Sequence, residues 1–149
     1  MLHLLFRLGQ ETFAVPAGDI QAVLPLAELE SLALAPPAVA GLLRYQGRFV
    51  PVLDVGVIHS GTPAARVIST RIVLVRATEQ ETLLGLLVER AMEMLDLHDR
   101  QVLAPAFLGP GHDWLAPTLY DTELGLVRAI DWRALLTREI ESLAVADDA

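Results

Sequence analysis

Apolar and polar residues alternate at the start of the chain with the period of two that is typical of β-strands. Leu4, Phe6 and Leu8 fall on one face of the first predicted strand, over residues 2–8. A turn that contains glycine follows, and a second apolar stretch then covers residues 12–24. The two stretches together predict a β-hairpin.

Proline and glycine break the second stretch and mark the limits of later segments. Pro16 lacks an N–H and Gly18 lacks a side chain, so a bend is predicted there, and a strand resumes over Ile20–Leu24. Residues 35–41 have room for at most one helical turn, and residues 56–69 form a polar connection. Short apolar runs predict six further strands: Arg48–Val55, Thr70–Arg76, Leu83–Glu89, Ala91–Leu97, Trp114–Tyr120 and Glu123–Ile130.

One helix is predicted near the end of the sequence, beginning at Asp131, which is a good N-cap residue. Apolar residues of this segment fall near one helical face, and Trp132 among them is expected in the core rather than at a ligand site. The residues of this face are Trp132, Leu135, Leu136, Ile140 and Leu143. Residues 144–149 have little to bury and are expected to fray, so the predicted domain spans residues 1–143.

The predicted fold class is mainly β. Many short strands separated by glycine and proline favour a barrel or a sandwich over an alternating α/β sheet. The chain has 149 residues, of which 53% are hydrophobic, so it is long enough to bury a substantial core. Neither a repeat nor a break in composition divides it, and a single domain is therefore expected.

Composition excludes several classes of protein. The net charge of -8 opposes the cationic surface that nucleic-acid binding requires. The absence of cysteine excludes a disulfide framework and a thiolate metal site. The longest apolar segment, Leu32–Leu43, contains two prolines and is too short to cross a bilayer. The sequence begins without the basic leader of a signal peptide, so a cytoplasmic protein without direct membrane insertion is expected.

Candidate catalytic and metal-binding residues are few. None of the four histidines has the spacing to another histidine that a zinc site uses, so no metal is expected, and no cofactor is expected either. A hydrolase would need converging ionisable residues, for which Asp54, His59 and Glu89 are the only candidates. Asp54 is better interpreted as a residue that bonds the backbone at the end of a strand. A small-ligand β-barrel is the other alternative, and it would need an enclosed apolar cavity.

Three segments of the chain resemble the CheW-like family of chemotaxis coupling proteins, over about residues 4–143. The first, Phe6–Val15, has a Phe-x-Leu strand, a polar turn and an aromatic residue. The most specific, Pro37–Val55, is similar to the family's Pro-x-x-x-x-Gly stretch, its turn ending in Gly and its Val-Pro-Val-Ile-Asp-Leu strand. The third, Gly85–Leu95, is similar to Gly-x-x-Val-Asp-x-Val-x-x-Val. The order and spacing of the three segments argue against coincidence.

The resemblance implies both a fold and a function. The fold would be two small five-stranded SH3-like β-barrels around a shared hydrophobic core, with a C-terminal α-helix. The function would be that of a non-catalytic adaptor. It would couple the cytoplasmic tip of methyl-accepting chemoreceptors, docked in a groove between the barrels, to the regulatory domain of a CheA-like histidine kinase.

Six residues are predicted from this resemblance to bind the receptor or the kinase: Ile20, Ala22, Arg44, Tyr45, Gln46 and Gly47. Gly47, like Gly41, is also expected to supply a positive φ at the turn. The family has an acidic residue at the position of Ala22 and an arginine at the position of Gln46, so both members of a potential charge pair are neutral here. This departure predicts an adaptor of an alternative chemosensory pathway, with its own receptor and kinase.

Overall fold

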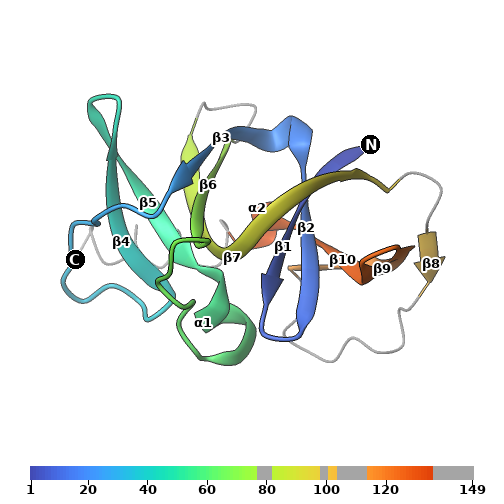
Figure 1. Cartoon of the computed structure of the whole chain (residues 1–149). Helices are drawn as coiled ribbons and strands as arrows, with labels where there is room; N and C mark the ends of the chain where they lie inside the picture. The colour runs from blue at the N-terminus through green and yellow to red at the C-terminus, as the bar shows by residue number, and fades with distance from the viewer. Residues whose placement is uncertain (77–81, 98–100, 104–113, 136–149) are drawn as a thin grey trace.

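Short β-strands make up most of the protein in the computed structural model, which describes residues 1–76, 82–97, 101–103 and 114–135 (Figure 1). The strands are β1 (Leu2–Leu8), β2 (Glu11–Pro16), β3 (Ile20–Pro25), β4 (Val39–Tyr45), β5 (Arg48–Asp54), β6 (Arg71–Arg76), β7 (Leu83–Asp96), β8 (Gln101–Leu103), β9 (Leu115–Thr122) and β10 (Gly125–Ile130). A 3-10 helix, η1 (Ala17–Asp19), and two short α-helices, α1 (Val55–Ser60) and α2 (Trp132–Leu135), complete the described part.

Strand β7 is shared by two sets of strands. Its first half, residues 83–88, pairs with β6 and β5. Its second half, residues 89–96, pairs antiparallel with β1. At the change of partners Arg90 has a positive φ of 48°, which residues with a side chain rarely adopt. Figure 1 shows β7 crossing the molecule from one strand set to the other.

The first strand set has the order β3-β6-β7-β5-β4. An antiparallel bridge between Glu30 and Leu42 joins the segment after β3 to β4, so the two ends of this set meet. Gly41 allows this approach, because a Cβ atom there would lie 2.6 Å from the carbonyl oxygen of Glu30. The second strand set has the order β7-β1-β2-β10-β9-β8. Two strand sets that share one strand are consistent with the expected pair of barrels.

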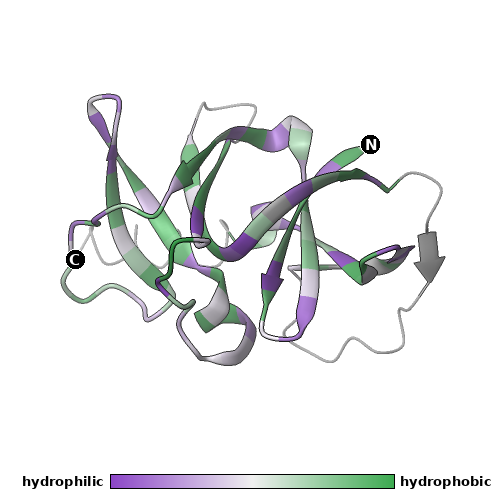
Figure 2. Ribbon diagram, in the orientation of Figure 1, coloured by the Kyte–Doolittle hydropathy of each residue, from purple (hydrophilic) through white to green (hydrophobic). Residues whose placement is uncertain are grey.

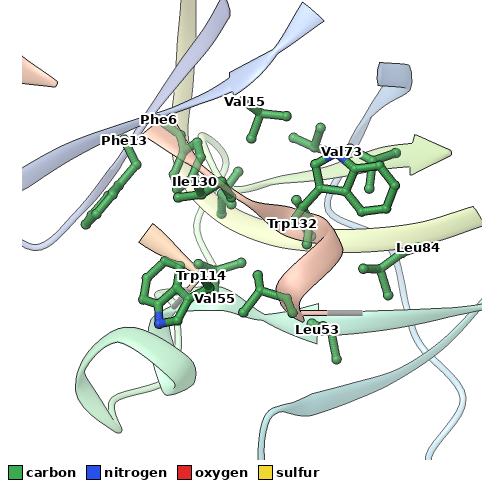
Figure 3. Close-up of a cluster of buried hydrophobic side chains, with 14 of the residues drawn as sticks. Phe6, Phe13, Val15, Leu53, Val55, Val73, Leu84, Trp114, Ile130 and Trp132 are labelled. Atoms are coloured by element: carbon green, nitrogen blue, oxygen red, sulfur yellow. The ribbon is translucent and has the colours of Figure 1, made fainter. Parts of the chain in front are cut away.

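A shared core of buried side chains lies between the two strand sets (Figure 3). Phe6 and Phe13 of the second set stack with ring centroids 5.8 Å apart, and Leu53 and Val73 enter from the first set. The largest fully buried side chains include Trp114 and Trp132, which belong to the same cluster. Burial of such large apolar surfaces is the main favourable term in folding, so this core holds the two strand sets together.

Each strand set also has an inner core of its own. The first inner core includes Leu43, Val52 and Leu74, and the second includes Leu5 and Val127. Strand β7 supplies side chains to all three cores: Leu84, Leu86 and Val88 to the shared core, Leu83 and Leu87 to the first inner core, and Leu95 to the second. Figure 2 shows polar residues gathered at the hairpin turns, as expected where the chain meets solvent.

The mainly β fold class predicted from the sequence is confirmed, and so is the bend at Pro16 and Gly18, where η1 separates β2 from β3. The positive φ predicted for Gly41 and Gly47 is also confirmed, at 149° and 80°. Asp131 accepts a hydrogen bond from the backbone N–H of Arg133 at 3.2 Å, as an N-terminal residue of a helix does.

The structure departs from the sequence predictions at three places. Strand β4 over residues 39–45 was not predicted, and it forms because hydrogen bonding to β5 overrides the local effect of proline and glycine. Helix α1 interrupts the predicted polar connection over residues 56–69. The two predicted strands over residues 83–97 are one strand, β7.

Part of the predicted C-terminal region lies outside the described residues. This applies to Leu136, Ile140 and Leu143, to the domain boundary at residue 143, and to the tail over residues 144–149. The described part of the helix buries Trp132 and Leu135, which confirms the prediction that Trp132 belongs to the core.

Gly85 of β7 provides a test of packing in the first inner core. A Cβ atom at this position would lie 2.8 Å from Cγ2 of Val52 and 3.2 Å from Cγ2 of Ile72. Both neighbours are buried and β-branched, so they have little freedom to move. We expect Gly85→Ala to lower the free energy of unfolding in urea by about 1–3 kcal/mol.

Gly18→Ala is the matched control for this substitution. A Cβ atom at Gly18 would have no other atom within 4 Å, and the backbone there does not have a positive φ. Its effect on the free energy of unfolding should stay within about 0.5 kcal/mol. Equal stability of the two variants would show that β7 is not tightly packed against β5 and β6.

His3 is a buried titratable side chain near the second inner core. It is 5% exposed, and its Nδ1 atom lies 3.1 Å from the carbonyl oxygen of Met1. Its ring centroid is 6.1 Å from that of Tyr120. Burial lowers the pKa of His3 below its ordinary value of 6.5, because the charged imidazolium loses its solvation.

The lowered pKa of His3 predicts a pH-dependent stability. The unfolded chain binds a proton at His3 more readily than the folded chain does, so this contribution is complete above about pH 6.5 and is lost as the pH falls through the lowered pKa. His3→Leu removes the titration. The free energy of unfolding of the variant should therefore decrease less between about pH 7 and pH 5 than that of the parent, and equal decreases would contradict the assignment.

Candidate functional site

The β4–β5 hairpin ends in an exposed turn that we call the hairpin tip, residues 44–49. Tyr45 pairs with Arg48, which leaves Gln46 and Gly47 as a two-residue loop. Both loop residues have positive φ, 47° and 80°, as a type I′ turn requires. Glycine favours this conformation and glutamine does not, so Gln46 adopts a backbone geometry that is uncommon for its type.

The hairpin tip is cationic and partly aromatic. The guanidinium carbon of Arg44 lies 4.8 Å from the ring centroid of Phe49, its cross-strand partner. Phe49 is 50% exposed. Within the described part of the chain, neither Arg44 nor Arg48 has a carboxylate partner. An exposed arginine stacked on an aromatic ring is a typical anchor of protein interfaces.

Strand β3 carries the other two predicted binding residues. Ile20 packs against the shared core, and Ala22 packs against the first inner core. A change of register between these residues places the two side chains on different cores. Both side chains are half-buried, whereas the side chain of Val23, which follows Ala22, is 44% exposed. In the described residues β3 pairs only with β6, which makes it an edge strand.

The structure brings together only part of the predicted binding set. Ala22 and Tyr45 pack against the same inner core, so Tyr45 caps the core at the base of the hairpin tip. Arg44, Gln46 and Gly47 are exposed. The predicted binding residues therefore lie in two places. Those on the edge strand β3 have half-buried side chains, and those of the hairpin tip are exposed except for Tyr45.

A cavity of about 670 Å³ lies between α1, the β1–β2 turn and the bend of β7. Charged and polar side chains line much of it, including Arg7, Glu11, His59, Glu89 and Arg90. The Nε2 atom of His59 lies 3.5 Å from Oε1 of Glu11. This lining differs from the enclosed apolar cavity that a small-ligand barrel would need.

The three hydrolase candidates are only partly brought together, because Asp54 is absent from the lining of this cavity. Asp54 is 3% exposed and caps α1. It accepts hydrogen bonds from the backbone N–H groups of Gly56 at 3.0 Å, Val57 at 3.3 Å and Ala64 at 3.1 Å. The interpretation of Asp54 as a residue that bonds the backbone at a strand end is therefore confirmed.

One contact that joins distant parts of the chain was not predicted from the sequence. Asp19 of η1 accepts hydrogen bonds from Trp132 and Arg133, which lie 113 and 114 positions further along. No local pattern connects such residues. Phe49 was missed as well, although its position in the strand after an exposed turn was a usable signal.

The described residues contain no group of three or more His, Asp or Glu side chains that could hold a metal ion. In this same part of the chain, no helix has the length and apolar character needed to cross a membrane.

The fold and the site together define a β protein whose described residues include an exposed hairpin tip and an edge strand. A family model, the CheW-like domain, matches residues 2–139. The chain belongs to the CheW-like family, as its sequence segments indicated.

A solved structure supports this fold. The scaffolding protein TtCheW from Thermoanaerobacter tengcongensis superposes with a TM-score of 0.72 and 17% sequence identity. The match covers 87% of this chain and 82% of that chain. No match was found among curated proteins. The predicted CheW-like fold is therefore confirmed by structure as well as by family.

Asp54 offers a test of its structural role. Asp54→Ala leaves three buried or partly buried N–H groups without their acceptor, so we expect the free energy of unfolding to fall by about 2 kcal/mol. Asp54→Asn should cost less, because the amide oxygen still accepts. Glu28→Ala, at an exposed carboxylate, is the control and should change stability by no more than about 0.5 kcal/mol in urea denaturation. An alanine variant as stable as the parent would refute the cap.

Proposed function

We propose that this protein is a chemosensory adaptor that acts in the cytoplasm and catalyses no reaction. It couples the cytoplasmic tip of methyl-accepting chemoreceptors to the regulatory domain of a CheA-like histidine kinase by binding both. Membership of the CheW-like family over residues 2–139 is the observation that carries this proposal. The similarity of the fold to that of TtCheW, a scaffolding protein, supports it.

The hairpin tip and strand β3 are the proposed binding elements. In a chain with a net charge of -8, the exposed Arg44 and Arg48 form a local cationic site that suits an acidic partner surface. Phe49 adds exposed aromatic area beside them. Strand β3 contributes an edge that pairs, in the described residues, with β6 alone, and Ile20 and Ala22 pack against the cores behind it. Rigid anchoring of this kind lowers the entropy lost on binding.

The mechanism of such an adaptor is differential binding. A receptor can change the activity of the kinase through the adaptor only if the adaptor's contacts differ in free energy between the kinase's active and inactive states. No bond is made or broken in this role. Among the described residues, the Asp54 carboxylate accepts hydrogen bonds from the backbone, and this fits a scaffold better than a hydrolase.

The purified chain should co-sediment with its cognate receptor cytoplasmic fragment and with the kinase regulatory domain. We expect the double variant Arg44→Ala/Phe49→Ala to weaken binding of at least one partner by roughly tenfold or more, as loss of interface anchors does. The thermal transition should change little, because Arg44 is exposed and half of the surface of Phe49 is exposed.

Arg66→Ala/Leu126→Ala is the matched control, since it removes an exposed arginine and an exposed apolar side chain elsewhere. It should bind both partners as the parent does. Unchanged binding by the hairpin-tip variant would reject the hairpin tip as a binding element. Failure of the unmodified chain to bind either partner would reject the adaptor function itself.

A further inference from the structure

Asp19, Trp132 and Arg133 form a network that connects the start of β3 with the C-terminal helix α2. The indole Nε1–H of Trp132 donates a hydrogen bond to Oδ2 of Asp19 at 2.9 Å. The guanidinium of Arg133 donates to both oxygens of the same carboxylate, Nη1 to Oδ2 and Nη2 to Oδ1, each at 3.3 Å. We call these three residues the Asp19 network.

The Asp19 network is built on the shared core. Trp132 is 1% exposed, and Figure 3 shows its indole among the other side chains of this core. The guanidinium carbon of Arg133 lies 4.6 Å from the centroid of the Trp132 ring, so the arginine stacks on the indole as well as pairing with Asp19. The Asp19 side chain is 19% exposed. Hydrogen bonds that involve charged groups are roughly twice as strong as those between neutral groups.

Asp19 lies where the chain passes from one strand set to the other. Strand β2 of the second set ends at Pro16, η1 covers Ala17–Asp19, and β3 of the first set begins at Ile20. The backbone N–H of Ile20 bonds to the carbonyl oxygen of Ala17, so the direction in which β3 leaves η1 is fixed locally. The only register shift in the pairing of β3 with β6 follows directly, between Ile20 and Ala22.

An edge strand beside a register shift has few hydrogen bonds of its own to define its position. Strand β3 pairs with β6 on one side, and Ile20 meets the shared core only at its periphery. The Asp19 network supplies a fixed point immediately before this strand. Because Trp132 is anchored in the core, the carboxylate of Asp19 is held against a rigid part of the protein.

We propose that Asp19, held by Trp132 and Arg133, is a positioning residue for partner recognition. It sets the start of β3, and thereby the position of Ile20, for the partner that binds this strand. This inference rests on the proposed adaptor function and deepens it. It gives helix α2 a supporting role in binding, because α2 holds the binding strand in place without touching the partner. The proposed partner of this strand is the helical receptor tip of the proposed adaptor function.

Asp19→Asn is the first test, since its amide oxygen still accepts from Trp132 while the charge that pairs with Arg133 is lost. Binding of the receptor fragment should weaken by roughly tenfold, while binding of the kinase regulatory domain should change less than twofold. Asp121→Asn, at an exposed carboxylate on β9, is the control and should leave both affinities unchanged. Equal weakening for both partners would indicate a general structural defect and overturn the proposal.

A double-mutant cycle with Ile20→Ala tests whether Asp19 acts through the strand. If it does, Asp19→Asn should cost little further affinity once Ile20 is truncated, and the two effects should not add. Additive losses of receptor affinity would overturn the proposal. The single Ile20→Ala variant also shows whether this strand takes part in binding at all.

Hydrogen exchange provides a readout that needs no partner. In Asp19→Asn the amides of Ile20–Leu24 should exchange roughly tenfold faster, while those of Arg48–Asp54 in β5 keep their rates. Unchanged exchange in β3 would overturn the positioning role even if the receptor binds. Faster exchange in β3, with no receptor binding by the parent protein, would instead support the positioning role and reject the proposed function.

Discussion

The sharing of β7 between two strand sets is the constraint on which the rest of the structure depends. A single strand supplies side chains to the shared core and to both inner cores. Its side chains alternate between faces, and the backbone changes partners at Arg90. A change in the register of this strand would therefore exchange buried and exposed side chains in both sets at once. We therefore expect the two sets of strands to unfold together.

The junction between the strand sets is stabilised at two places besides the shared core. On one side, His59 of α1 lies 3.5 Å from Glu11 of β2, with its ring 5.1 Å from that of Phe13. On the other, the Asp19 network joins η1 to α2. A partly exposed pair such as His59–Glu11 contributes little by itself. The Asp19 network, anchored on a buried tryptophan, is the stronger contact and is adjacent to the proposed binding strand.

Sequence patterns gave the fold class and most strands, because alternation and turn residues act locally, as at Leu4, Phe6 and Leu8. They failed at residues 39–45, where proline and glycine suggested a break but pairing with β5 makes a strand. Asp54 was interpreted correctly because its hydrogen bonds are largely to neighbouring backbone. The Asp19 network was not predictable, since its partners meet only after the whole chain has folded. The six predicted binding residues stay predictions, supported by exposure at the hairpin tip.

The continuous path of β7 limits how this protein can be recombined with its relatives. In a chimera joined near residue 89, the two halves of β7 would come from different parent proteins. The side chains of the shared core and of both inner cores would then have to fit together across the junction. The hairpin tip, by contrast, ends in a two-residue turn with exposed side chains. A change of partner preference should therefore be engineered by exchanging the hairpin tip and not whole halves of the chain. We expect the hairpin tip to differ more between members of the family than β7 does, for the same reason.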